Sequence, residues 1–132
     1  MIYPLINTGK PGVYEYAYLR EAVTKVIEYI KTWSDRTIMV GHVKDIQLEK
    51  AGGEFTASDL DLTGKIKRIL SSQSDAIGYM YRKNSTQNIL SFATKETVAC
   101  GARPQHLRNA EIVISEMTDE GLVTHWDKVY ID

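Results

Sequence analysis

The stretch Thr37–Asp45, TIMVGHVKD, decides the fold that the sequence predicts. Residues 38–40 are all apolar, and charged residues bound the stretch on both sides. A short apolar run of this kind is typical of a strand buried on both faces, as in a parallel sheet. His42 would then stand at the carboxyl end of the strand, next to Gly41, where a ligand can come close to the backbone. Because open α/β sheets bind ligands at that edge, we expect the binding crevice there.

A long helix is predicted ahead of this strand, over residues 13–33. Apolar residues recur in it at spacings of three and four, which gives one apolar stripe. Helix, turn and buried strand make up half of a βαβ unit, which normally has a strand before the helix. Residues 2–6, interrupted by Pro4, are expected to form that edge strand or an ordered tail, and residues 7–12 a loop.

Residues 46–63 lack a steady hydrophobic period and are expected to form a long, mobile loop. A hairpin tip near residues 50–53 is the alternative for part of it. A short helix is predicted over residues 64–72, with Asp61 or Thr63 as its cap.

The second half of the chain predicts an antiparallel β-meander, because short apolar runs alternate there with turn-forming residues. The predicted fold class is therefore α/β: a partial parallel sheet with a long N-terminal helix and a C-terminal antiparallel meander, in one domain over residues 1–132. The expected strands of the second half cover residues 76–82, 88–94, 111–117 and 122–131, with a turn over 83–86 and a loop over 95–109.

Composition and charge are those of an ordinary globular domain. Of 132 residues, 43% are hydrophobic and 25% are charged, and the net charge is −1, so a nucleic-acid site must be a local patch. Cys100 is the only cysteine, which excludes an internal disulfide and fits a reducing compartment. No apolar run approaches the roughly 18 residues of a membrane span, and no secretory signal is recognisable. We expect a cytoplasmic protein with no membrane partner.

Phosphate-loop and metal motifs are absent from the sequence. The loop pattern G-x-x-x-x-G-K-[ST] fails at residues 9–10, where Pro4 replaces the first glycine, and at residues 64–65, where Asp59 does. The histidines and Cys100 lack metal-ligand spacing, so no metal site is predicted.

Three side chains are candidates for chemistry at a phosphate. His42 could hydrogen-bond a phosphate or an attacking water, although a histidine on an apolar strand is most often an ordinary core or edge residue. Lys95 and Arg103 lie on or beside the 95–109 loop, and paired cations there could stabilise charge on a phosphoryl group of a neighbouring subunit. They could also lower the pKa of the Cys100 thiol. The ordinary alternative for both cations is solvation.

A second candidate is a basic patch with aromatic neighbours. Cations beside aromatic rings suit single-stranded nucleic acid, and a solvated helix face is the plain alternative. The patch would combine Tyr79 and Tyr81 with Lys65, Lys67, Arg68, Arg82 and Lys83.

At this point the order of elements resembles that of phage-type RecA-like ATPases of the AAA class, which take part in single-strand DNA annealing and recombination. The resemblance covers about residues 13–118. In that family a buried strand ending in a polar residue, here His42, acts as a phosphate sensor, and a late basic loop leads into a terminal strand. The stretches that carry it are TIMVGHVKD (37–45), LTGKIKRILSSQSDAIGYMYR (62–82), ILSFATK (89–95) and GARPQHLRNAEIVIS (101–115).

The resemblance implies the C-terminal half of a RecA-like core, because the family's phosphate loop and magnesium carboxylate are missing here. ATP and Mg²⁺ would bind through Gly41 and His42 only if a phosphate-loop partner completes the site. The expected partners are a second copy, a complete ATPase or single-stranded DNA, in the host cytoplasm if a phage encodes the chain. A fragment, a split-gene product and a degenerate paralogue stay open. The rival hypotheses are a non-enzymatic module that binds nucleic acid or protein, and a purely structural protein.

Overall fold

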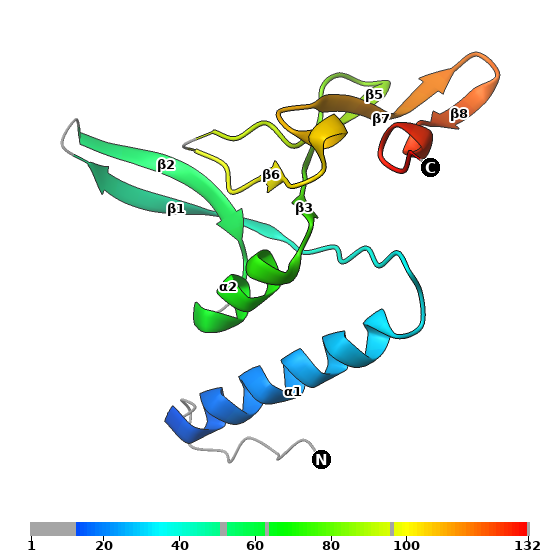
Figure 1. Cartoon of the computed structure of the whole chain (residues 1–132). Coiled ribbons are helices and arrows are strands. Elements are labelled where there is room, and N and C mark those ends of the chain that lie inside the picture. The colour runs from blue at the N-terminus through cyan, green and yellow to red at the C-terminus, as the bar shows by residue number, and fades with distance from the viewer. Residues whose placement is uncertain (1–12, 51–52, 63, 96, 132) are drawn as a thin grey trace. The chain divides into compact units, whose positions relative to one another are not determined.

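The computed structural model describes residues 13–50, 53–62, 64–95 and 97–131 (Figure 1). The edge strand and loop predicted over residues 2–12, and the Thr63 cap, lie outside the described residues. The chain divides into two compact units. The first holds both α-helices and the segment that ends at His42, and the second holds all the described strands. The expectation of one domain over residues 1–132 stays a prediction.

Two helices form the first unit. α1, Val13–Lys31, confirms the predicted long helix, and Ile27 of its apolar stripe is buried. α2, Gly64–Gln73, confirms the short helix and contacts α1, with Ile66 buried. Among the described residues, no helix is both long and apolar enough to cross a membrane.

The buried strand predicted over Thr37–Asp45 is wrong. Residues 37–42 form no strand, and the side chains of Ile38, Met39 and Val40 are 56%, 51% and 94% exposed. Strand structure begins only at Val43. A buried parallel strand needs a partner from a distant segment, whereas an antiparallel hairpin needs only a short connection. The chain takes the second solution with the residues that follow.

An antiparallel hairpin replaces the long mobile loop predicted over residues 46–63, so that prediction is wrong as well. β1, Val43–Lys50, pairs along its whole length with β2, Gly53–Leu60, and the alternative hairpin tip near residues 50–53 is confirmed. Ile46 faces Ala57 in the register. On the other face, the Ser58 hydroxyl donates to Asp45 Oδ1 at 3.0 Å.

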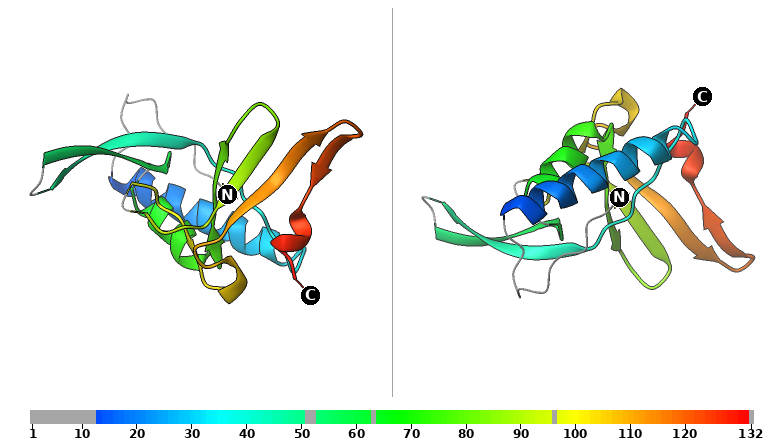
Figure 2. Two further views of the ribbon diagram at one scale, coloured as in Figure 1. Left: turned by 90° about the horizontal axis from the view of Figure 1, so that it is seen from above. Right: turned by 90° about the horizontal axis from the view of Figure 1, so that it is seen from below.

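A four-stranded antiparallel sheet in the order β4-β5-β7-β8 forms the second half, which confirms the predicted hairpin and meander. β7 and β8, the orange and red-orange strands of Figure 2, run side by side. The ladders between the described strands are all antiparallel, and the one parallel contact among the described residues is an isolated bridge between Ser58 and Val98. The fold is therefore mixed α/β, and its described strands form no parallel sheet of the kind that the sequence led us to expect. The bounds are β3 Ala76–Ile77, β4 Tyr79–Arg82, β5 Gln87–Ser91, β6 Gly101–Ala102, the 3₁₀ helix η1 Gln105–Leu107, β7 Glu111–Thr118, β8 Gly121–Thr124 and the 3₁₀ helix η2 Trp126–Lys128.

Several boundaries in this half differ from those predicted, and β5 ends at Ser91 rather than residue 94. The strand over residues 76–82 is interrupted at Gly78, the loop over 95–109 contains β6 and η1, and the last strand ends at Thr124 rather than Ile131. At Gly78 the backbone passes so close to the core that a Cβ there would stand 2.6 Å from Leu90 Cδ1. A side chain at residue 78 would therefore collide with the core, which accounts for the glycine at this position.

One face of the sheet carries the core of this unit. Leu90 on β5 stands opposite Ile112 on β7, and both are buried. The full cluster is Leu90, Phe92, Leu107, Ile112 and Ile114. Because side chains alternate along a strand, Tyr79, Tyr81 and Ser91 lie on the other face.

Candidate nucleic-acid interface

Two stacked tyrosines form the centre of the candidate site. Tyr79 and Tyr81 are two residues apart on β4, so both rings stand on the same face of the sheet. Their centroids are 5.9 Å apart and their planes differ by 26°. β4 is an edge strand of the four-stranded sheet, and both tyrosine side chains are partly buried.

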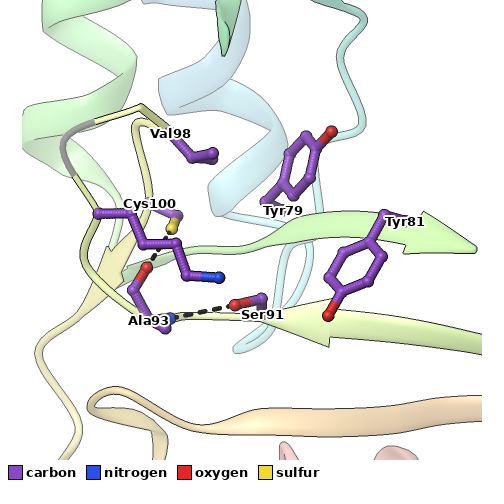
Figure 3. A pocket seen from close by; sticks show the side chains of 7 residues that line it. Tyr79, Tyr81, Ser91, Ala93, Val98 and Cys100 are labelled. Atoms are coloured by element: carbon purple, nitrogen blue, oxygen red, sulfur yellow. Dashed lines mark hydrogen bonds between the residues drawn. The ribbon is translucent and has the colours of Figure 1, made fainter. Parts of the chain in front are cut away.

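An open cavity of about 360 Å³ lies beside the tyrosines (Figure 3). One wall comes from β4 and β5, and the other comes from the loop after β5, which turns back toward the sheet. The lining residues are Tyr79, Tyr81, Ser91, Ala93, Lys95, Val98 and Cys100. The cavity thus combines aromatic rings, a cation and a hydroxyl.

Backbone hydrogen bonds to β2 and to Ala110 hold the described part of the loop after β5, residues 92–95 and 97–100. The Ser58 N–H on β2 donates to the Thr97 carbonyl at 2.6 Å, and the Ala99 N–H donates to the Ser58 carbonyl at 3.2 Å. At the start of the loop, the Phe92 N–H donates to the Ala110 carbonyl at 2.8 Å. These bonds position Lys95, which also lines a second cavity of about 190 Å³.

Lys95 is paired with a carboxylate at the rim of the site. Its Nζ lies 3.4 Å from Glu111 Oε1, and the two side chains are 53% and 47% exposed. The Ser91 hydroxyl donates to the same Glu111 oxygen at 3.2 Å. Ser91 is only 3% exposed, so its hydroxyl is a fixed anchor for the carboxylate. Because exposed ion pairs are weak, Lys95 can exchange this partner for another anion.

The Cys100 thiol is unsuited to nucleophilic chemistry. It donates to the Ala93 carbonyl at 2.9 Å. Burial raises the pKa of the thiol above its ordinary value, and the nearby Lys95 offsets that effect only in part. The lowered pKa considered from the sequence is therefore wrong, because desolvation outweighs the neighbouring charge.

His42 and Gly41 lie exposed in the segment before β1. The His42 carbonyl accepts a hydrogen bond from the Asp61 N–H at 2.8 Å. Without the buried strand, a contact between these two residues and a nucleotide rests on the sequence resemblance alone.

Arg103 is tied to the start of the second half of the chain. The Arg103 Nη1 atom lies 3.6 Å from Asp75 Oδ1, and the backbone N–H of Arg103 donates to the backbone carbonyl of Asp75 at 2.8 Å. Both Lys95 and Arg103 therefore have carboxylate neighbours in their own unit, and their action on a neighbouring subunit stays a prediction.

The residues of the predicted basic patch are divided between the two units of the chain. Lys65, Lys67 and Arg68 lie on α2 in the first unit, with Lys65 and Arg68 exposed. Arg82 is exposed at the end of β4 in the second unit, on the face opposite Tyr81. Within the second unit, the structure brings together the tyrosine pair and Lys95.

Sequence reasoning missed Ser91 and Glu111. The hairpin prediction gave no register, and the observed register pairs Ser91 with Tyr79. Glu111 reaches the site only because β5 pairs with β7 across twenty residues, where Ser91 faces Glu111. Nothing local in the sequence marks that pairing. Comparisons with protein-family models, with curated proteins and with solved structures find no match to this chain.

Proposed function

We propose that this chain binds single-stranded nucleic acid on the sheet face that carries Tyr79 and Tyr81. The observation that supports it is the stacked tyrosine pair beside Lys95 in an open cavity. Bases of a single strand stack on aromatic rings, and a neighbouring cation contacts the phosphate backbone. Such binding needs no recognition of particular bases, because every base has a stacking face.

The wider setting is proposed from the sequence resemblance. We propose a RecA-like recombination or annealing ATPase of phage type, to which this chain contributes the C-terminal half and which does not hydrolyse ATP by this half alone. In that assembly His42 faces the γ-phosphate, and Lys95 and Arg103 act on a neighbouring subunit. ATP and Mg²⁺ require a partner with a phosphate loop.

The test is a titration of labelled oligo-thymidine with the protein, followed by fluorescence anisotropy at two salt concentrations. We expect binding that weakens as salt rises, because phosphate contacts release counterions. Tyr79→Ala and Tyr81→Ala should each weaken binding roughly tenfold, since one base stack contributes about 1–3 kcal/mol. Tyr29→Ala, at an exposed tyrosine on α1, is the matched control and should leave the affinity unchanged.

Absence of binding at low salt would contradict the proposal, and so would tyrosine variants that bind like the wild type. A separate arm measures the unfolding temperature with and without ATP–Mg²⁺. A rise supports a retained nucleotide site. No rise, together with salt-sensitive DNA binding, favours a binding module without nucleotide.

Self-association is a second candidate, favoured by the exposed apolar residues 38–40. Extended apolar segments on a surface invite pairing with another chain. Sedimentation at two protein concentrations tests it. Val40→Lys should shift the distribution to monomer, whereas Thr37→Lys, which adds the same charge at a neighbouring polar position, should not. A wild-type protein that stays monomeric at both concentrations contradicts this candidate.

A further inference from the structure

We infer that Glu111 competes with nucleic-acid phosphate for Lys95 and thereby tunes the affinity of the site. This inference rests on the proposed function. Glu111 is the first residue of β7 and faces Ser91 in the register, so its backbone position is fixed by the sheet. Its carboxylate accepts from the Ser91 hydroxyl at 3.2 Å and lies 3.4 Å from Lys95 Nζ.

The Glu111 carboxylate is held more firmly than the Lys95 side chain with which it pairs. Ser91 is buried and is held twice, because its hydroxyl donates to Glu111 and accepts from the Ala93 N–H at 3.3 Å. Lys95 belongs to a loop, and its side chain is half exposed. When a phosphate arrives, the part that moves is therefore the lysine ammonium, and the carboxylate stays behind.

Lys95 is well placed to move between anions. It lines both the cavity beside the tyrosines and the smaller cavity next to β2. Among the described residues that line these two cavities it is the single cation. A nucleic-acid strand stacked on Tyr79 and Tyr81 would thus present its phosphates to the Lys95 ammonium, which is already paired with Glu111. The Glu111 charge both occupies that ammonium and repels the phosphate.

Removal of the carboxylate charge should therefore tighten binding. Glu111→Gln keeps the side-chain length and an oxygen for the Ser91 hydroxyl, but it removes the competing charge. We expect affinity for oligo-thymidine to rise about threefold to tenfold at low salt. The gain should shrink as salt rises, because salt also screens the Lys95–Glu111 pair in the wild type and frees the lysine.

Two comparisons separate this role from a purely structural brace. Glu120→Gln, in the exposed turn between β7 and β8, changes the net charge equally and should alter the affinity less than twofold. In a Lys95→Ala background, most of the gain from Glu111→Gln should disappear, since coupled residues are not additive. A brace for the loop would instead lower the unfolding temperature without raising affinity.

The experiment is the oligo-thymidine titration, with unfolding temperatures measured on the same samples. Threefold or greater tightening in Glu111→Gln, dependent on Lys95, is the expected result. Affinity equal to that of Glu120→Gln, in a protein whose binding depends on Tyr79 and Tyr81, overturns the inference alone. A wild type that does not bind overturns the proposed function as well. Should Glu111→Gln fail to fold, Glu111→Thr, which suits a strand, provides the same comparison.

Discussion

Gly78 is the position where one added methyl group should test the packing of the second unit most sharply. A Cβ at this residue would stand 2.6 Å from Leu90 Cδ1 and 3.0 Å from Phe92 Cε1. Both neighbours are buried in the core cluster, so neither can swing into solvent. Gly78→Ala therefore forces the core to shift.

The magnitude follows from two opposing terms. Overpacking of a well-packed core costs about 1–3 kcal/mol. Alanine also has less conformational freedom than glycine in the unfolded chain, which stabilises the folded protein by about 0.4–1 kcal/mol. We expect Gly78→Ala to lower the free energy of unfolding by about 1–2 kcal/mol, which is a fall of about 4–8 °C in the unfolding temperature for a chain of this size.

Urea unfolding followed by circular dichroism measures this change. Gly101→Ala is the matched control, because its Cβ would meet nothing closer than Thr94 Oγ1 at 3.7 Å, and it should be neutral or slightly stabilising. Leu90→Val removes the atom nearest to the new methyl group. The double variant Gly78→Ala with Leu90→Val should therefore be more stable than the sum of the two single effects predicts. Equal midpoints for Gly78→Ala and wild type, or strict additivity in the double variant, would refute the packing described at β4 and β5.

Three further predictions concern a turn, a carboxylate and a thiol. Asn84→Ala should lower the free energy of unfolding in urea by about 1–2 kcal/mol, because Asn84 Oδ1 accepts three hydrogen bonds within the turn between β4 and β5. An unchanged midpoint would contradict this. The hydrogen bond with His125, and then that from Gln87, lowers the pKa of Glu116 from its ordinary value of 4.5. Ionised Glu116 therefore stabilises the fold at a pH above 4.5, and this stabilisation is lost as the pH falls through the lower pKa of the folded state. Urea midpoints of wild type and Glu116→Gln should therefore converge between a pH of about 6 and about 3; a constant gap would count against it. Since burial raises the pKa of the Cys100 thiol, alkylation by iodoacetamide at a pH of about 8 should be slower in the folded protein than in urea, and equal rates would show that the thiol is not shielded.

The sequence correctly predicted α1 and the β4–β5 hairpin, whose formation depends on residues close together in the chain. The long helix over α1 follows from a 3.6-residue apolar period, and the β4–β5 hairpin follows from two apolar runs around a turn. Asn84 in that turn accepts bonds from its own neighbours, so the turn can be recognised within four residues. These predictions are confirmed because their causes lie close together in the chain.

The predictions that failed depended on which segments meet. The apolar run at residues 38–40 predicts burial only if other strands cover both of its faces, and the described residues place it in the open. A hairpin tip near residues 50–53 was considered, but the two strands on either side of it were predicted as a loop. Polar pairs such as Asp45 with Ser58 satisfy one face of this hairpin, and that pairing is visible only once the register is known. The candidate site shares this property, since Glu111 reaches Lys95 through the β5–β7 ladder.

The hydrogen bonds between Ser58 and the loop after β5 make two distant segments open together. The Ser58 N–H and the Ala99 N–H are both bonded across this contact, at 2.6 Å and 3.2 Å. Neither amide can exchange its hydrogen with deuterated water until the loop separates from β2. A bound nucleic-acid strand that fixes Lys95 should therefore slow hydrogen exchange at the Ser58 amide. Ser58 itself does not line the cavity beside the tyrosines. The β1–β2 hairpin would in this way report on events at a surface that it does not form.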